Sequence, residues 1–380
     1  MDFSLSDEQQ AIGELAGQIL TEKLPAERLR AIEATTERMA DDVWIELAKA
    51  NLLGIALPED VGGSGFGILE ACLVLEQIGR TVAPVPYLPT VVLGAMAIAE
   101  FGTEAQRRRD LPGVIDGEVV LTAAIAEEGV DPALGATPTT ATRDGDGWLL
   151  DGQRQFVPAA HLARRVLVPA RTGDDTLGVF LVDPATPGVE VTRLETTTLE
   201  PQFLLTFSGV RLGGEDVLGD PSSGAETLTW MLRRGTVALC ATQAGVCSAA
   251  LRLTAGYVSQ REQFGSKIAT FQAVAQRAAD AYIDSEAVSL TWRQAAWRLA
   301  EGLDADEAIA VAKFWAADGG QRVVHAAQHL HGGIGVDVDY PLHRYFRWAK
   351  QLELSLGGST QQLRRLGRLL ASDEPITSRA

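Results

Sequence analysis

The sequence predicts a mainly α-helical protein with a β domain in the middle of the chain. Apolar residues recur at helical spacing over residues 6–101, and the same period returns after residue 224 and continues to about residue 372. Over residues 118–218 the pattern changes to short β-prone runs bounded by turn residues. The order along the chain is therefore α, then β, then α.

In the first third, Ser6 is the expected N-cap of a helix whose face carries Ile12, Leu15 and Ile19. Two segments interrupt the helical pattern. Residues 58–67 are rich in glycine and serine, and we expect helix to resume near Ile68. Residues 81–89 contain three prolines, which predict a second break.

The central segment contains the runs VVLTAAIA, TPTTATR, GWLLDGQRQFV, RRVLVPA, LGVFLVD and VEVTRL, with turns expected at 144–147 and 172–175. Long Ala- and Leu-rich helical stretches follow, such as 273–299 and 306–331. We expect an all-α domain over 1–117, a β domain over 118–220 and a helical bundle domain over 221–380.

Charge and cysteine content exclude several function classes. The 380 residues carry 33 Lys and Arg against 50 Asp and Glu, a net charge of −17, which disfavours a nucleic-acid-binding surface. The three cysteines form no CxxC pair, as expected for a reducing compartment. The first residues carry no basic, apolar signal pattern, and no run of about 18 apolar residues occurs. We therefore expect a cytoplasmic protein with no membrane span.

The segment Arg261-Glu262-Gln263-Phe264-Gly265 lies between two expected helices. An arginine beside fresh backbone donors at a helix junction suits a phosphate or pyrophosphate. The alternative is an ordinary inter-helix loop with an exposed arginine.

The segment His331-Gly332-Gly333-Ile334-Gly335 follows an expected helix, and its glycines either let the backbone approach a ligand or only cap the helix. No GxSxG elbow accompanies it, which excludes an α/β-hydrolase. His325 and His329 stand four residues apart, but without HExxH or a further ligand we expect no metal site. Residues 62–67 lack the GxGxxG spacing, so a Rossmann nucleotide site is not expected.

Five segments, taken together and in this order, resemble the acyl-CoA dehydrogenase family: 58–80, 207–224, 261–265, 271–280 and 331–350. The resemblance covers nearly the whole chain. It implies an N-terminal helical domain, a middle β-barrel or sandwich, and a C-terminal four-helix bundle through which members usually form tetramers. It also implies FAD as cofactor and an acyl-CoA substrate, whose α-proton is removed by a carboxylate while the flavin takes the β-hydride.

The resemblance implies that several residues contact the diphosphate and adenine half of FAD, often from a neighbouring subunit. These residues are Arg261, Gln263, Phe264, Phe271, Gln272, His329, Gly332 and Gly333. At His329 the family has a glutamine, and Gln328 is one place off. The flavin ring would be held by residues 126–131 and 156–159. Here Pro158 offers neither a hydroxyl nor a backbone N–H, so this half of the site departs from the family pattern.

The expected positions of the catalytic base depart further from the family pattern than the flavin-ring stretches do. The family glutamate falls at Leu356, or at Gly357 if a gap is moved, and in other members at Gly235. None of these residues can accept a proton. Glu353 is a weak candidate for a displaced base, and the alternative for it is an exposed helix-face glutamate.

Three functions are compatible with this pattern. The first is the base-lacking subunit of a hetero-oligomeric α2β2 acyl-CoA dehydrogenase, in which a homologous catalytic subunit shares the FAD; several such pairs act on steroid side-chain thioesters. The second is a self-sufficient homotetramer with a displaced base, and the third is a non-catalytic acyl-CoA-binding or assembly protein on this fold. In the first two, an electron-transfer flavoprotein or similar acceptor would take the electrons. The CoA phosphates would meet Arg233 or Arg234, unless these are only surface arginines.

Overall fold

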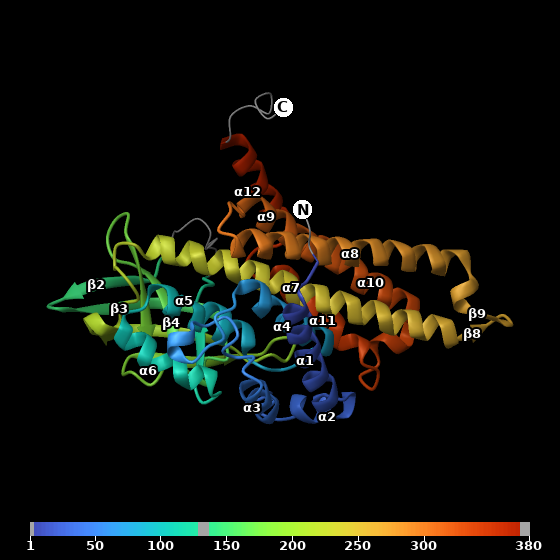
Figure 1. Ribbon diagram of the computed structural model, residues 1–380, viewed down its shortest axis with the longest axis horizontal. Helices are drawn as coiled ribbons and strands as arrows, with labels where there is room; N and C mark the ends of the chain where they lie inside the picture. Colours follow the sequence, from blue (N-terminus) through green and yellow to red (C-terminus); the bar gives the residue numbers. More distant parts are fainter. Residues whose placement is uncertain (1–3, 128–136, 373–380) are drawn as a thin grey trace. The chain divides into compact units, whose positions relative to one another are not determined.

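The computed structural model describes residues 4–127 and 137–372 (Figure 1). The chain forms two compact units, each assembled from separate stretches of sequence. The first unit comprises residues 1–26, 72–83 and 236–380, and the second comprises 27–71 and 84–235. The predicted domain boundaries at 117/118 and 220/221 stay predictions.

The expected fold class is confirmed: helices dominate both ends of the chain, and a sheet lies in the middle of the sequence. The N-terminal helices are α1 (Asp7–Lys23), α2 (Ala26–Glu33), α3 (Asp41–Lys49), α4 (Ile68–Thr81), α5 (Met96–Phe101) and α6 (Glu104–Ile115). Ser6 caps α1 in a capping box with Gln9, in which each side chain accepts the other residue's backbone N–H.

The two expected breaks behave differently. Over 58–67 the chain makes only a short 3₁₀ turn, Glu59–Val61, and α4 begins at Ile68 as expected. The second break is shorter than expected, because a π-helical segment begins at Leu88 and continues to Ala95. Pro89 fits its first turn, where a missing N–H breaks no hydrogen bond.

The second unit contains one curled sheet of seven strands in the order β1-β4-β2-β3-β7-β6, with β5 paired to β4. The strands are β1 (Val120–Ala123), β2 (Thr140–Asp144), β3 (Gly147–Pro158), β4 (Ala163–Arg171), β5 (Leu177–Val182), β6 (Val189–Leu194) and β7 (Gln202–Leu212). The sequence runs did not single out β7, which pairs antiparallel with both β3 and β6. Trp148, Phe180 and Phe207 belong to the core that the sheet encloses.

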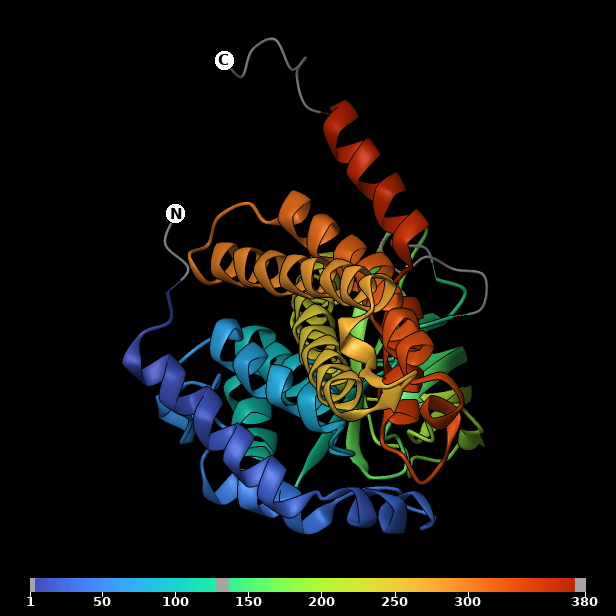
Figure 2. The same ribbon diagram turned by 90° about the vertical axis from the view of Figure 1, so that its right-hand side faces the viewer.

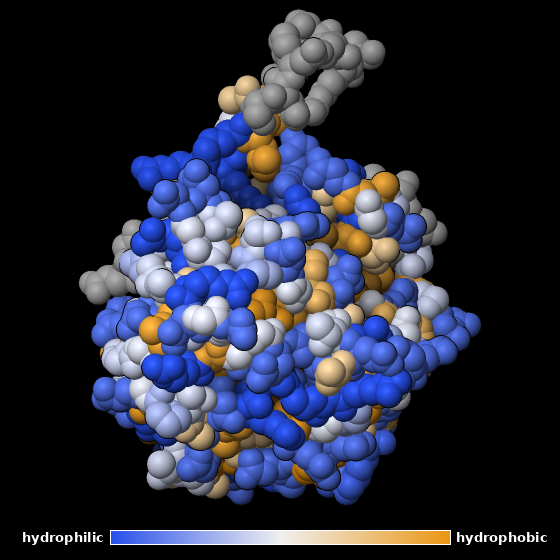
Figure 3. Space-filling model, turned by 90° about the vertical axis from the view of Figure 1, so that its left-hand side faces the viewer, coloured by the Kyte–Doolittle hydropathy of each residue, from blue (hydrophilic) through white to orange (hydrophobic). Residues whose placement is uncertain are grey.

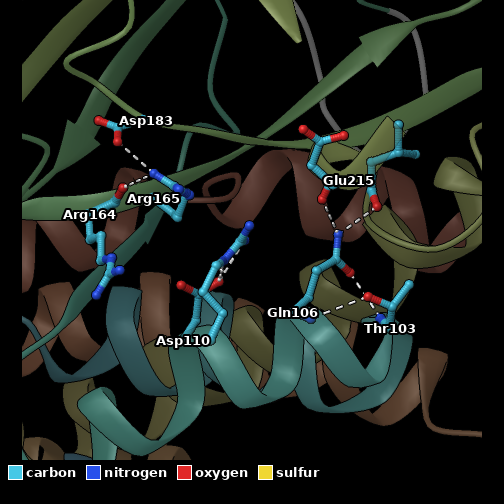
Figure 4. A network of polar contacts seen from close by, with 9 residues as sticks. Thr103, Gln106, Asp110, Arg164, Arg165, Asp183 and Glu215 are labelled. Atoms are coloured by element: carbon cyan, nitrogen blue, oxygen red, sulfur yellow. Dashed lines mark hydrogen bonds and ion pairs between the residues drawn. The ribbon is translucent and has the colours of Figure 1, made fainter. Parts of the chain in front are cut away.

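A hydrogen-bond network joins α6 to the loop after β7 within the second unit (Figure 4). The buried Gln106 side chain donates to the carbonyl oxygens of Glu215 and Val217, each at 2.8 Å. Its amide oxygen accepts from the backbone N–H of Thr103, which completes the capping box of α6. One glutamine therefore caps the helix and attaches it to the β segment.

The C-terminal helices are α7 (Gly224–Gln260), α8 (Gln272–Ala300), α9 (Asp306–Phe314), α10 (Gly320–His331), α11 (Leu342–Leu354) and α12 (Ser359–Ser372). A π-helical turn, Trp315–Gly319, joins α9 to α10 without a break. In the first unit α8 packs on both α9 and α10, and α12 packs on α9 (Figures 1 and 2). Among the described residues only α7 is long and apolar enough to cross a membrane, and 78% of its most apolar stretch is buried inside the protein, as in a core helix.

Within the first unit, α4 and α7 approach backbone to backbone. A Cβ added at Gly245 would lie 1.9 Å from the carbonyl oxygen of Glu76, and one at Gly79 would lie 2.0 Å from that of Thr242. Only glycine permits such an approach at both positions. On the face in Figure 3, hydrophilic residues predominate and hydrophobic ones lie scattered among them.

Candidate functional site

The segment predicted to meet a diphosphate forms a small hairpin between α7 and α8. Its strands are β8 (Glu262–Gln263) and β9 (Ser266–Lys267), and its turn places Phe264 and Gly265 at positive φ angles of 53° and 74°. A two-residue turn of this kind matches the twist of paired strands. Arg261 and Gln263 are exposed, and Phe264 is 95% exposed at the tip. The hairpin therefore presents a guanidinium and an aromatic ring to its surroundings.

Phe271 and Gln272 stand where α8 begins, with Phe271 at the N-cap. The rings of Phe264 and Phe271 lie edge to face with centroids 6.4 Å apart. Both rings are exposed although their geometry is that of a packed pair. The fold thus brings together the predicted residues from both sides of the hairpin.

The glycine segment after α10 forms a 3₁₀ turn, residues 332–336. Gly332 ends α10 with φ 65°, so it does serve as a cap. A Cβ added at Gly332 or Gly333 would meet nothing within 4 Å, and both residues are exposed. Gln328 donates from its side chain to the Gly332 carbonyl at 3.3 Å, whereas His329 is exposed.

An aromatic cluster that the sequence did not single out lies behind these two segments. His331, only 4% exposed, stacks on Tyr257 with ring centroids 4.6 Å apart and an interplanar angle of 19°. Its Nδ1 lies 2.8 Å from the carbonyl oxygen of Ala327, and its Nε2 lies 3.0 Å from the hydroxyl of Tyr340. Burial lowers the pKa of His331 below its usual 6.5, which favours the neutral ring.

In the second unit, the described part of the first stretch expected near a flavin ring, Ala126 and Glu127, contacts Arg154 and Gln155, which directly precede the second stretch, 156–159; residues 128–131 lie outside the described residues. The backbone N–H of Gln155 donates to the carbonyl of Ala126 at 3.0 Å. Arg154 and Glu127 form a buried ion pair at 3.0 Å, with side chains 3% and 2% exposed. Burial lowers the pKa of Arg154 to about 10, while the Glu127 charge acts in the opposite direction.

The end of β3 has an irregular backbone. Phe156 has φ 51° and is 58% exposed, and the register of β3 against β7 shifts between Arg154 and Val157. The carbonyl of Pro158 accepts a hydrogen bond from the Thr122 hydroxyl at 2.6 Å. Pro158 therefore takes part in the sheet through its one remaining backbone group.

The expected base positions carry no carboxylate. Leu356 has φ 53° and Gly357 φ 96°, in the turn between α11 and α12, and Gly235 is buried inside α7. Glu353 lies in the last turn of α11, where its carboxylate accepts from the Lys350 ammonium at 2.6 Å. Its side chain is 16% exposed, so it is more enclosed than the helix-face alternative implies.

Lys313 was not expected at all. Its side chain is fully buried, and its ammonium donates to the carbonyl oxygens of Leu352 and Glu353 at 2.9 and 3.0 Å. Burial lowers its pKa to about 8, and the electrostatic interactions with Cys240 and Glu353 oppose that shift. The lysine therefore caps the C-terminal end of α11, directly before Leu356.

The two arginines suggested for CoA phosphates lie on α7, in the second unit, and both are half-buried. The guanidinium of Arg234 stacks 3.6 Å from the ring centroid of Trp230, and burial lowers its pKa to about 10. Arg234 is therefore more enclosed than a solvated surface arginine. In the described part of the chain no group of three or more His, Cys, Asp and Glu residues is arranged to hold a metal ion.

Comparison with known proteins settles the family. Three acyl-CoA dehydrogenase domain models match in the expected order: the N-terminal domain over residues 6–118, the middle domain over 122–202 and the C-terminal domain over 222–371. The chain belongs to the acyl-CoA dehydrogenase family. It is an oxidoreductase acting on acyl-CoA, and its cofactor is FAD.

Several individual relatives match over nearly their whole length. The chain is 41% identical to acyl-CoA dehydrogenase FadE27 of Mycobacterium tuberculosis, covering 98% of this chain and 99% of the relative. A variant of the Tcur3481–Tcur3483 steroid ACAD matches at 48% identity with a TM-score of 0.90, covering 97% and 99% of the two chains. The ChsE4–ChsE5 complex from Mycobacterium tuberculosis contains a chain that matches at 41% identity with a TM-score of 0.93, covering 99% and 100%.

The exposed residues of the first unit fit the adenine and diphosphate end of FAD. Arg261 offers an unburied guanidinium, and Gly332 and Gly333 offer backbone with open space where a side chain would stand. The flavin-ring end has a weaker fit in this chain, since Pro158 lacks an N–H.

Proposed function

We propose that this chain is the base-lacking subunit of a two-chain acyl-CoA dehydrogenase. A homologous catalytic subunit would supply the carboxylate, and this chain would supply Arg261, Gln263 and the Gly332–Gly333 turn to FAD shared with that subunit. The observation that carries the proposal is the absence of an acid at Leu356, Gly357 and Gly235. Without a base the α-proton of an acyl-CoA has no acceptor at those places.

Exposed apolar residues support assembly with a partner. Tyr282, Ile283 and Leu290 of α8 are 57%, 63% and 52% exposed, and Phe264 adds a ring at the hairpin tip. Alanines 273, 275 and 279 on the same helix are also exposed. Apolar surface gathered on one helix and its adjoining hairpin is typical of a subunit interface.

In the proposed assembly this chain binds and orients FAD, and it does not accept the proton of the substrate. Arg261 would donate charge-assisted hydrogen bonds to a diphosphate, and the glycine turn would admit the cofactor backbone without steric conflict. When bound, FAD would supply the acceptor for the β-hydride of the substrate, and an electron-transfer flavoprotein or similar acceptor would then take the electrons. The hydrogen bonds from Lys313 to the carbonyls of Leu352 and Glu353 would hold the backbone before Leu356, where other family members carry the base.

The proposed substrate class is a lipid acyl-CoA, with steroid side-chain thioesters as the leading candidates. The support is the similarity to the steroid ACAD at 48% identity over 97% of the chain. A turnover comparison of steroid side-chain, short-chain and long-chain thioesters tests this part separately from the assembly.

The decisive experiment compares the chain purified alone with the chain co-expressed with a homologous subunit that has the glutamate. We expect flavin absorbance only in the co-expressed sample, at about one FAD per pair of chains. Arg261→Ala should weaken FAD binding about tenfold. Arg108→Ala is the matched control, because Arg108 is an exposed arginine paired with Glu104 on α6.

Two outcomes would overturn the proposal. A lone chain with one FAD per chain and dehydrogenase turnover would indicate the self-sufficient homotetramer. Acyl-CoA binding without flavin, in the presence and absence of the partner, would indicate a non-catalytic acyl-CoA-binding protein.

A further inference from the structure

The hairpin and the glycine turn are far apart in sequence, yet one buried imidazole connects them. Tyr257 lies in the last turn of α7, and its carbonyl accepts the backbone N–H of Arg261 at 2.9 Å. His331 is the last residue of α10 and immediately precedes Gly332. The stack of His331 on Tyr257 therefore joins the base of the hairpin to the start of the glycine turn.

The hydrogen bonds of His331 fix how the ring is held. A carbonyl oxygen only accepts, so the Nδ1 facing Ala327 carries the proton. In the neutral ring Nε2 then accepts from the Tyr340 hydroxyl, 3.0 Å away. Tyr340 closes the loop that follows the glycine turn, and its ring also meets Tyr257 edge to face at 6.4 Å. Ala327, Tyr340 and Tyr257 together fix the orientation of the imidazole ring.

We propose that His331 is a positioning residue that holds the Arg261 hairpin and the Gly332–Gly333 turn in the one arrangement that binds a dinucleotide diphosphate. The inference rests on the proposed function for the ligand, but the coupling of the two segments stands on the contacts themselves. Two segments that contact one ligand must be held to within about 0.5 Å, which flexible loop ends do not achieve alone. A buried stack with two hydrogen bonds supplies that rigidity.

Three substitutions and one control substitution separate the contributions of the stack and of the hydrogen bonds. His331→Phe keeps a ring against Tyr257 but removes both hydrogen bonds, and Tyr340→Phe removes only one hydroxyl. Tyr257→Leu removes the stack, and Tyr257→Phe is its matched control because the ring remains.

The first measurement is hydrogen exchange of the unliganded chain, which needs no cofactor and no partner. Tyr257→Leu and His331→Phe should speed amide exchange in both 261–268 and 332–340, while exchange in α12 and in the sheet stays unchanged. Tyr257→Phe should match the wild type. Faster exchange only around the substituted residue would overturn the coupling, and so would no change in either segment.

The second measurement is the dissociation constant for FAD of the assembled complex. We expect His331→Phe and Tyr257→Leu to raise it about tenfold, Tyr340→Phe to raise it less, and Tyr257→Phe to leave it within twofold. A lowered unfolding midpoint with an unchanged dissociation constant would overturn the inference, because His331 would then be structural only. If Arg261→Ala leaves FAD binding unchanged, the hairpin does not bind FAD and that part of the proposed function is wrong. The exchange data would still show whether His331 couples the hairpin to the glycine turn.

Discussion

The buried ammonium of Lys313 lies 2.9 Å from the main-chain carbonyl oxygen of Leu352, at the C-terminal end of α11. It also meets the next carbonyl, that of Glu353, so a single side chain on α9 satisfies two of the orphan acceptors that end a helix. Keeping this ammonium charged in the core lowers the free energy of unfolding by an amount that depends on pH.

We expect the free energy of unfolding to depend on pH through the titration of Lys313. Its pKa is about 8 in the folded chain against 10.5 for the free side chain, so the unfolded state binds more protons between these values. Stability should therefore rise as the pH rises from 8 to 10.5, by about 3 kcal/mol from this group. The buried thiols of Cys240 and Cys247, whose pKa values are raised to about 12, oppose this trend above pH 9, so the Lys313 contribution is the difference between wild type and Lys313→Met in urea unfolding at several pH values. Lys49→Met, at a lysine whose side chain is 67% exposed, should keep the slope.

Two glycines of α7 should respond in opposite directions to alanine. Gly245→Ala places a Cβ against the backbone of α4 and should destabilise the chain by about 3 kcal/mol or more. Gly256→Ala meets nothing within 4 Å and is exposed, so it should stabilise the chain by about 0.5–1 kcal/mol through the lower helix propensity of glycine. Thermal unfolding of both variants checks this, and equal effects would contradict the close packing of α4 and α7.

The buried pair Glu127 and Arg154 should show strong coupling. Arg154→Met leaves the Glu127 carboxylate buried without its cation and should cost about 3–5 kcal/mol. The double variant with Glu127→Gln removes both charges and should recover part of that loss. A double-mutant cycle by chemical denaturation measures the coupling, and strictly additive effects would rule it out.

Glu353→Gln should leave turnover of the assembled complex within about threefold. The carboxylate is bound to Lys350 at 2.6 Å, and the proposed function places the base on the other subunit. Loss of a general base typically costs at least about 10²-fold in rate. A fall of that size in kcat would instead identify Glu353 as a displaced base and favour the self-sufficient enzyme. Lys350→Met is a useful companion, because it frees the carboxylate without removing it.

Local patterns in the sequence predicted the elements well where the physics is local. The cap at Ser6, the break at 58–67 and the restart of helix at Ile68 depend on nearest neighbours along the chain, and each was confirmed. The family and its cofactor followed from five segments in a fixed order and were also confirmed. The roles of Arg261, Gln263 and the other assigned FAD contacts stay predictions.

The tertiary structure decided what depends on contacts between distant segments. The stack of Tyr257 on His331 and the clamp of Lys313 on Leu352 each join residues whose separation along the chain leaves no periodic signal. The need for glycine at Gly245 likewise comes from the α4 backbone rather than from its own helix. The sequence by itself determined the fold class, the family and the absence of an acid at Leu356, Gly357 and Gly235, because these are properties of residue type and order. Which side chains are buried, paired and held in register was decided only when packing brought distant segments together.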